Sequence, residues 1–296
     1  MCGFVYKLWK WAWSGGHRFL YLKPKTLDEA VSLLAASGGQ LLAGGTDFYP
    51  ALGERLPQGD VVDITSLKEI RGISFESEWI RIGGLTTWTD VIRTPLPRCL
   101  DGLKAAAREV GSVQIQNRGT VAGNLCNASP AADGVPPLLA LNAEIELASR
   151  VGTRCVPLAD FITGNRKTLR QADEILSGIL VPRQIEEAPA AFLKLGARKY
   201  LVISISMVAA VVPSDAGRVS DARIAVGSCS AKAQRLRDLE RDLAGQLAKP
   251  GIGSNVNASH LAPLSPIDDI RATADYRRDA SLTLVRRTLE ACVGAQ

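Results

Sequence analysis

Two glycine-rich stretches hold the residues best suited to bind a ligand. The first is LLAGGTD at 41–47, an apolar run that ends in Gly44 and Gly45 and continues into Thr46 and Asp47. Glycines at the end of a strand expose backbone N–H groups, and without a Cβ they let a phosphate oxygen approach closely. The Thr46 hydroxyl adds a donor, and a helix beginning near Asp47 would direct its positive end at an anion. These residues lack the GxGxxG and P-loop spacings, so a plain strand-to-helix turn stays open.

The second stretch is GTVAGNLCNASPAADGVPP at 119–137. It combines glycines with small polar side chains that can donate hydrogen bonds, and Asp133 is its one carboxylate. A tight packing crossover between strands is the alternative interpretation. Two stretches that could each bind phosphate, in one chain, predict a single extended ligand with the shape of a dinucleotide, lying between two lobes.

The flanking patterns predict the elements that position these stretches. In the first half we expect strands at 18–23, 40–43, 60–65, 143–149, 153–158 and 174–182, a hairpin at 73–84, and helices at 26–38, 87–92, 100–110 and 136–142. From about residue 190 the pattern changes to antiparallel strands within 192–212 and 219–230. Two helical patterns follow, at 231–246 and 280–293. The second half therefore predicts an α+β domain.

The composition favours an ordinary globular chain of two domains. The 296 residues carry a net charge of +5 that is not gathered into a stripe, so a nucleic-acid footprint is not expected. The six cysteines form no CxxC pair and there are only two histidines, which argues against a metal site or a disulfide framework. We expect a cytoplasmic protein without a membrane span. Residues 1–16 hold three of the five tryptophans and have no assigned role.

Four segments, in order along the chain, resemble one family. They are AGGTD at 43–47, NRGTVAGNLCNASPAADGVPPLLALNAEIEL at 117–147, FLKLGARKYLVISISMVAAVV at 192–212 and SPIDDIRATADYRRDASLTLVRRTLEA at 265–291. Together they resemble the FAD-binding medium subunit of the molybdenum hydroxylases, a family that includes the flavin parts of xanthine dehydrogenase, carbon monoxide dehydrogenase and quinoline oxidoreductase. Each motif alone would be weak, but four in register over residues 18–292 are specific.

The resemblance implies a fold and a domain division. It implies an α+β protein with a two-lobed FAD-binding domain of the vanillyl-alcohol oxidase/MurB type at 17–183, with lobes of about 17–72 and 73–183. A C-terminal α+β domain with an antiparallel sheet would follow at 184–296, and residues 1–16 would be an N-terminal extension.

The resemblance also implies the cofactor site. The backbone from Leu41 to Phe48, with the Thr46 hydroxyl, would hold the FAD diphosphate, and Thr120 to Asn124 would close on it and the ribityl chain. Asp133 and Leu176 match contacts to the cofactor, Lys194 matches a lysine near the pyrimidine edge of the flavin, and Val110 is a weaker candidate beside the ring. The full set is Leu41, Leu42, Ala43, Gly44, Gly45, Thr46, Asp47, Phe48, Thr120, Val121, Ala122, Gly123, Asn124, Asp133, Leu176 and Lys194.

One residue departs from the family pattern. Relatives commonly have glycine where this chain has Ala122. A positive φ there would cost about 1–2 kcal/mol for the added methyl, whereas a negative φ would cost little. We expect the negative φ. The four-cysteine cluster loop that some family members carry should be absent, because the cysteines are not clustered.

The implied function is electron transfer. FAD would be bound non-covalently, would collect electrons from [2Fe-2S] clusters of a small partner subunit, and would reduce an external acceptor. The molybdenum cofactor would lie in a large partner subunit, in a heterotrimer or its dimer. Two alternatives stay open: a self-contained FAD oxidoreductase of the same fold, and a flavin-free scaffold or binding subunit. The sequence identifies neither the substrate hydroxylated by the complex nor the acceptor, whether NAD, oxygen, a quinone or a protein.

Overall fold

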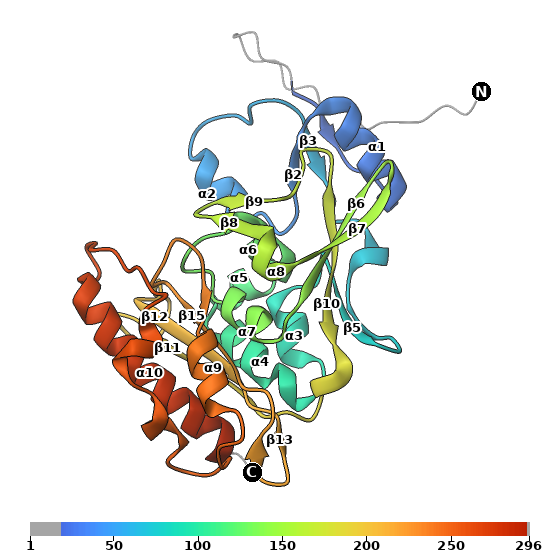
Figure 1. Cartoon of the computed structure of the whole chain (residues 1–296). Coiled ribbons are helices and arrows are strands. Elements are labelled where there is room, and N and C mark those ends of the chain that lie inside the picture. The colour runs from blue at the N-terminus through green and yellow to red at the C-terminus, as the bar shows by residue number, and fades with distance from the viewer. Residues whose placement is uncertain (1–18, 295–296) are drawn as a thin grey trace.

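The described part of the chain contains three main sheets, two small hairpins and the helices that pack against them. The structure is a computed structural model that describes residues 19–294, so the proposed extension at 1–16 lies outside the described residues. The sheets follow one another along the chain, and Figure 1 shows the helices of the middle segment between the second and third sheets. The mixture of helices and sheets predicted from the sequence is present.

The first sheet is small and parallel, with the order β1-β3-β2. Its strands are β1 (Tyr21–Leu22), β2 (Gln40–Leu42) and β3 (Val61–Asp63), and its helices are α1 (Leu27–Ser37) and the short α2 (Phe48–Leu52). The Thr26 hydroxyl caps α1 by accepting the Glu29 N–H, and Gly38 ends the helix at φ 61°. The predicted order of strand, helix and strand is therefore confirmed, and β2 leads directly into the Gly44–Gly45 turn.

The second sheet is antiparallel, with the order β4-β5-β10-β6-β7. Its strands are β4 (Ile73–Phe75), β5 (Trp79–Gly83), β6 (Glu144–Ser149), β7 (Gly152–Pro157) and β10 (Ile175–Pro182). The predicted hairpin at 73–84 is β4-β5. The central strand β10 is buried along nearly all its length, because it has strands on both edges and helices against it. A small hairpin, β8 (Ile162–Gly164) and β9 (Lys167–Thr168), stands apart from this sheet.

Six helices accompany the second sheet. They are α3 (Trp88–Arg93), α4 (Asp101–Glu109), α5 (Val113–Gln116), α6 (Val121–Asn127), α7 (Val135–Ala140) and α8 (Leu158–Phe161). Thr87 caps α3 in a capping box with Asp90, as its position before the predicted helix at 87–92 indicated. The stretch at 119–137 differs from its turn-like appearance, since α6 lies inside it and α7 begins near its end. The Thr120 hydroxyl caps α6 and supplies the start signal that its glycine and asparagine content obscures.

The third sheet is antiparallel with the order β11-β12-β15-β16, as predicted for the C-terminal half. Its strands are β11 (Ala190–Leu195), β12 (Ser206–Val211), β15 (Arg223–Gly227) and β16 (Gln234–Arg235), and β13 (Ser214–Asp215) pairs with β14 (Arg218–Val219) in a separate hairpin. Helices α9 (Arg237–Leu243) and α10 (Ala274–Gly294) cover one face. The predicted helix at 231–246 is shorter than expected, because residues 234–235 pair with β15 instead.

Alternate residues of the third sheet face two different cores. Met207, Ala209 and Val211 of β12 join the core that includes the helices of the middle segment. Val208 and Ala210 join the core beneath α9 and α10. The period of two in this apolar run thus places one sheet between two helical layers, and Figure 1 shows α4 and α7 on one side and α10 on the other. None of the helices within residues 19–294 has both the length and the apolar character needed to cross a bilayer.

A buried arginine joins the third sheet to the middle segment. Arg235 donates to the backbone carbonyl of Leu139 at 3.0 Å and to the Asn142 amide oxygen at 2.7 Å. Leu139 lies in the last turn of α7, and Asn142 follows the end of that helix. Its Nη2 also donates to Glu240 Oε2 at 3.0 Å, and Glu240 accepts the Ile224 N–H at 2.8 Å. The guanidinium of Arg235 therefore links the end of α7 to α9 through buried hydrogen bonds.

We predict that Arg235→Met destabilises the protein by about 3–5 kcal/mol, because it removes the buried cation of the Glu240 carboxylate and leaves it only the exposed Arg237, at 3.3 Å. Arg241→Met is the matched control: Arg241 pairs with Asp238 on the same helix, but both side chains are more than half exposed, so its loss should cost about 0–1 kcal/mol. Urea unfolding of both variants measures the difference. Equal costs for the two variants would show that Arg235 does not hold the third sheet to the middle segment.

Candidate functional site

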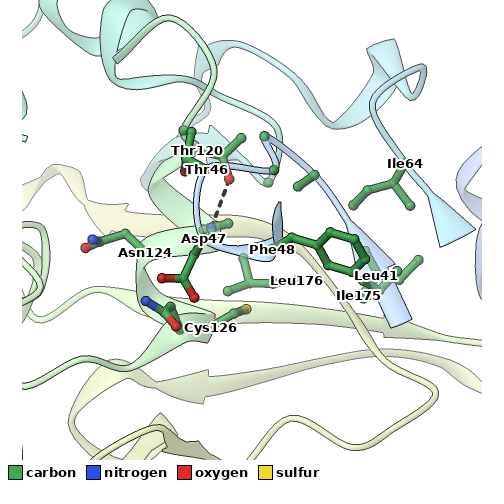
Figure 2. A pocket seen from close by; sticks show the side chains of 18 of the residues that line it. Leu41, Thr46, Asp47, Phe48, Ile64, Thr120, Asn124, Cys126, Ile175 and Leu176 are labelled. Atoms are coloured by element: carbon green, nitrogen blue, oxygen red, sulfur yellow. Dashed lines mark hydrogen bonds between the residues drawn. The ribbon is translucent and has the colours of Figure 1, made fainter. Parts of the chain in front are cut away.

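A cavity of about 590 Å³ lies where the two glycine-rich stretches meet. One wall is formed by the end of β2 and the turn into α2, and the other by the start of α6, as Figure 2 shows. Twelve residues of the predicted site line it: Leu41, Ala43, Gly44, Gly45, Thr46, Asp47, Phe48, Thr120, Ala122, Gly123, Asn124 and Leu176. Val110, the weaker candidate, lines it as well. Leu42 and Val121 do not; both side chains are buried.

The two walls touch through bare backbone. A Cβ built on Gly44 would lie 1.9 Å from the Arg118 carbonyl oxygen and 3.0 Å from the Gly119 Cα. A Cβ on Gly119 would lie 3.3 Å from the Thr46 hydroxyl oxygen. No side chain fits at Gly44, so the glycine is required for the two segments to approach. The proximity of the two stretches, predicted from their composition, is therefore confirmed.

The first turn presents a row of backbone donors. Among residues 19–294, no acceptor lies within hydrogen-bond distance of the backbone N–H groups from Gly44 to Phe48. Gly45 has φ +75°, the left-handed conformation that lets successive N–H groups point to one side. The Thr46 hydroxyl likewise has no hydrogen-bond partner in the described part of the chain. A concave set of free N–H and O–H donors is suited to bind an anionic group such as a phosphate.

The second turn is the first turn of α6. The Thr120 hydroxyl accepts the Gly123 N–H at 2.9 Å, and the Asn124 side-chain oxygen accepts the Gly134 N–H at 3.3 Å. A Cβ on Gly123 would lie 2.8 Å from the Thr120 hydroxyl oxygen, so a larger residue would disturb the cap. Ala122 is helical and is not among the residues with positive φ. The expected negative φ is confirmed, and the methyl group of Ala122 costs little there.

One end of the cavity is apolar. Leu41, Phe48 and Ile64 from the first segment meet Ile175 and Leu176 from β10. Figure 2 shows Leu41, Phe48 and Ile64 gathered together, away from Asn124. A flat aromatic ring with little charge would bury its faces against such a lining. The polarity of the lining therefore changes along the cavity, from an apolar end to the glycine turns with their hydrogen-bond donors.

A second cavity of about 390 Å³ adjoins the other end. It shares Val110, Ile115 and Asn124 with the first cavity, and residues 201–203 also line it. Asp133 lines this second cavity. Of the predicted site residues, Asp133 therefore lies at this second cavity, whereas Lys194 lines neither cavity and reaches the site through its contact with Asp133.

Asp133 and Lys194 form a buried ion pair. The Lys194 ammonium donates to Asp133 Oδ2 at 2.7 Å, and the exposed fractions of the two side chains are 6% and 8%. The Ser204 hydroxyl donates to the other carboxylate oxygen, Oδ1, at 2.7 Å. Burial raises the pKa of Asp133 above the usual range of an aspartate, and the charge of Lys194 with the hydrogen bonds of Lys194 and Ser204 opposes that rise.

Several lining residues carried no signal in the sequence. Arg170 is the one arginine or lysine that lines the first cavity among the described residues, and its Nη1 donates to the Gln171 and Glu174 carbonyl oxygens. Cys126 also lines it, and burial raises the pKa of its thiol to about 11, so it is not a reactive thiolate. Ser204 lines neither cavity and belongs to neither glycine-rich stretch, but it contacts the site through its hydrogen bond to Asp133. Each acquires its position only from the tertiary fold.

The described residues offer no grouping of three or more histidine, cysteine, aspartate or glutamate side chains that could hold a metal ion.

Two family models match the chain. The first, described as FAD binding domain in molybdopterin dehydrogenase, covers residues 17–184. The second, described as CO dehydrogenase flavoprotein C-terminal domain, covers residues 191–292. Between them they take in both halves of the chain and every residue that lines the two cavities.

Individual relatives agree with these matches. The nicotinate dehydrogenase FAD-subunit of Eubacterium barkeri is 40% identical over 195 residues, which are 63% of this chain and 66% of that subunit. The putative xanthine dehydrogenase FAD-binding subunit of Escherichia coli is 33% identical, over 93% of this chain and 96% of that one. Among solved structures, carbon monoxide dehydrogenase from Hydrogenophaga pseudoflava superposes with a TM-score of 0.86 at 31% identity, covering 94% of this chain and 98% of that one.

We predict that Gly45→Val weakens FAD binding at least about tenfold while the protein stays folded. A valine disfavours φ +75°, and its side chain would meet the Tyr49 ring, so the row of N–H donors is turned away. Loss of one hydrogen bond to a charged group is worth about 1.5 kcal/mol, which corresponds to a factor of about ten.

Gly217→Val is the matched control for this variant. Gly217 has the same φ of +75°, has nothing within 4 Å of a built Cβ, and lies in the β13-β14 turn away from the cavity. Both variants carry the same backbone cost of about 1–2 kcal/mol. Titration of each folded protein with FAD, followed by flavin fluorescence, compares them. A Gly45→Val protein that binds FAD as tightly as Gly217→Val would refute the role of the first turn.

Proposed function

The chain belongs to the family of FAD-binding medium subunits of the molybdenum hydroxylases, and we propose that it clasps the FAD diphosphate between the Gly44–Thr46 turn and the start of α6. The observation that carries this proposal is the shared cavity, whose walls touch through the backbone of Gly44 and Gly119. Several charge-assisted bonds from free N–H groups, at about 1.5–3 kcal/mol each, suffice to hold the cofactor without a covalent link.

With the diphosphate at the glycine turns, the adenine would lie toward the apolar end of the first cavity and the flavin toward the second cavity. The apolar end at Leu41, Phe48 and Ile64 suits the adenine ring, with Leu176 packing against the adenosine moiety. The ribityl chain passes Asn124, and the flavin ring reaches the second cavity beside Val110, Asp133 and Lys194. The two cavities share Val110, Ile115 and Asn124, which supports one ligand running through both.

The two walls of the cavity belong to the two lobes of a domain of the vanillyl-alcohol oxidase/MurB type. In this proposal the first lobe ends near residue 72 and the second near residue 183. The separate parallel sheet β1-β3-β2 and the antiparallel sheet that starts at β4 support this division. The C-terminal domain at 184–296 supplies Lys194 and the loop at 201–203, and so closes the flavin end.

The role of the chain is to pass electrons. Bound FAD supplies the redox chemistry, while this chain's residues fix its orientation and the charges around it. Electrons would come from [2Fe-2S] clusters of a small partner subunit, after substrate oxidation at a molybdenum cofactor in a large partner subunit. A complex of these three chains, or its dimer, is the proposed assembly. The structural likeness to a carbon monoxide dehydrogenase chain over 94% of this chain supports that arrangement.

A self-contained FAD oxidoreductase is the second candidate. It would need an acid–base side chain at the flavin end. The titratable side chain that lines the second cavity is Asp133, and Lys194 and Ser204 already occupy both its oxygens. This arrangement favours a chain whose flavin receives electrons from a partner over one that oxidises a substrate itself.

We predict that FAD in the full complex is bleached when the substrate of the complex is added, and that FAD on the purified chain alone is not. The test compares the flavin absorbance of the co-purified complex with that of the isolated, FAD-loaded chain during anaerobic addition of N-heterocycles, purines and aldehydes. Direct bleaching of the isolated chain would support the self-contained oxidoreductase. An isolated chain that takes up no FAD would support a scaffold.

A further inference from the structure

We propose that Ser204 is a positioning residue of the flavin site: its hydroxyl and the Lys194 ammonium hold the two oxygens of Asp133 and so keep Lys194 paired beside the flavin. This inference rests on the proposed location of the flavin ring in the second cavity. It assigns a role to a residue that lies outside both glycine-rich stretches.

The geometry gives each carboxylate oxygen its own donor. Asp133 Oδ1 accepts the Ser204 hydroxyl at 2.7 Å, and Oδ2 accepts the Lys194 ammonium at 2.7 Å. Within residues 19–294, the other hydrogen bond of that ammonium is to the Glu109 carbonyl oxygen at 3.5 Å. Ser204 is 2% exposed, so its hydroxyl is shielded from bulk solvent. With both oxygens held, the carboxylate plane is fixed and the ammonium is directed at Asp133.

Hydrogen bonds from α10 hold the segment that carries Ser204. The next residue, Ile205, accepts a hydrogen bond from Arg277 Nη1 of α10 at 2.6 Å through its backbone carbonyl oxygen. Arg277 is buried and is held in turn by Asp269 Oδ1 at 2.7 Å. The Ser206 hydroxyl lies 2.8 Å from the Ser281 hydroxyl of the same helix. Ser204 is therefore presented to Asp133 by a rigid strand start and not by a free loop.

The consequence concerns charge. A lone lysine beside the flavin would place a full positive charge there, whereas the ion pair is close to neutral and acts as a dipole. Protonation of Asp133 would release the positive charge of Lys194 to the site and would stabilise a negatively charged reduced flavin. The groups that face Asp133 are Lys194 from β11, Ser204 ahead of β12 and, through Lys194, the Glu109 carbonyl at the end of α4.

The loss of the Ser204 hydroxyl has a defined direction. A hydrogen bond to the ionised carboxylate lowers the pKa of Asp133, so its removal lets the carboxyl take up a proton at higher pH. For a hydrogen bond to a charged group, the expected displacement is about one to two pH units. Below that pH the site gains a positive charge, and the flavin midpoint potential rises.

The experiment measures the flavin midpoint potential against pH for the FAD-loaded chain and its Ser204→Ala variant. Wild type should show an inflection from Asp133, which Asp133→Asn removes. Ser204→Ala should move that inflection upward by about one to two pH units. Ser204→Thr, which keeps the hydroxyl, should restore it. Ser206→Ala is the matched control: Ser206 is the first residue of β12, two residues after Ser204, and is fully buried, but its hydroxyl faces Ser281, so the inflection should not move.

Three results would overturn the proposal: no inflection in wild type, an inflection unmoved in Ser204→Ala, or an equal displacement in Ser206→Ala. If Ser204→Ala does not fold, Ser204→Cys replaces it, because a thiol is a much weaker donor than a hydroxyl and should give the same upward shift. FAD stoichiometry is measured on every sample. A wild-type chain that binds no FAD would instead refute the proposed function, so the two failures are distinguishable.

Discussion

The structure depends on the contact of two bare backbone segments at Gly44 and Arg118–Gly119. A Cβ at position 44 would lie 1.9 Å from the Arg118 carbonyl oxygen, a separation that no side chain tolerates. The contact sets the width of the cavity and brings the free N–H groups after Gly44 opposite the start of α6. Because these donors have no partner among the described residues, an anionic ligand placed there would satisfy them without breaking any existing hydrogen bond.

Charge is distributed along the site in an order that matches a dinucleotide. The end lined by Leu41, Phe48 and Ile64 is apolar, the glycine turns in the middle offer neutral donors, and the Asp133–Lys194 ion pair at the second cavity is nearly neutral. In the proposed binding mode these parts face the adenine, the diphosphate and the flavin. Arg170 is the one cationic side chain that lines the first cavity in the described part of the chain, and its Nη1 is engaged by backbone carbonyl oxygens. Binding of the diphosphate therefore relies on oriented backbone dipoles more than on net charge, which makes glycine conformation more important here than lysine or arginine content.

Much of this arrangement follows from local sequence signals. The caps at Thr26 and Thr87, the hairpin at 73–84 and the apolar run within 192–212 are all local patterns, and each gave the correct element. The helix α6 could not be predicted in the same way, because its glycine and asparagines are poor helix formers and only the Thr120 cap and tertiary packing support it. The end of the predicted helix at 231–246 was likewise decided by a partner, since Gln234 and Arg235 pair with β15. The pairing of Asp133 with Lys194 and Ser204 joins residues 61 and 71 positions apart, and no spacing rule connects them.

The central claim is that both glycine turns grip the same diphosphate. Amide hydrogen exchange of the full chain, measured with and without FAD, tests it most directly. The N–H groups of Gly44–Phe48 donate no hydrogen bond within residues 19–294 and would become hydrogen-bonded in the complex. In the first turn of α6 the N–H groups of Val121, Gly123 and Asn124 are already hydrogen-bonded, and a ligand bound against this turn would suppress its opening. The account predicts that FAD slows exchange in both Gly44–Phe48 and Val121–Asn124, while the β13-β14 turn at 214–219 is unchanged. Slowed exchange in only one of the two segments, or in neither, would contradict it.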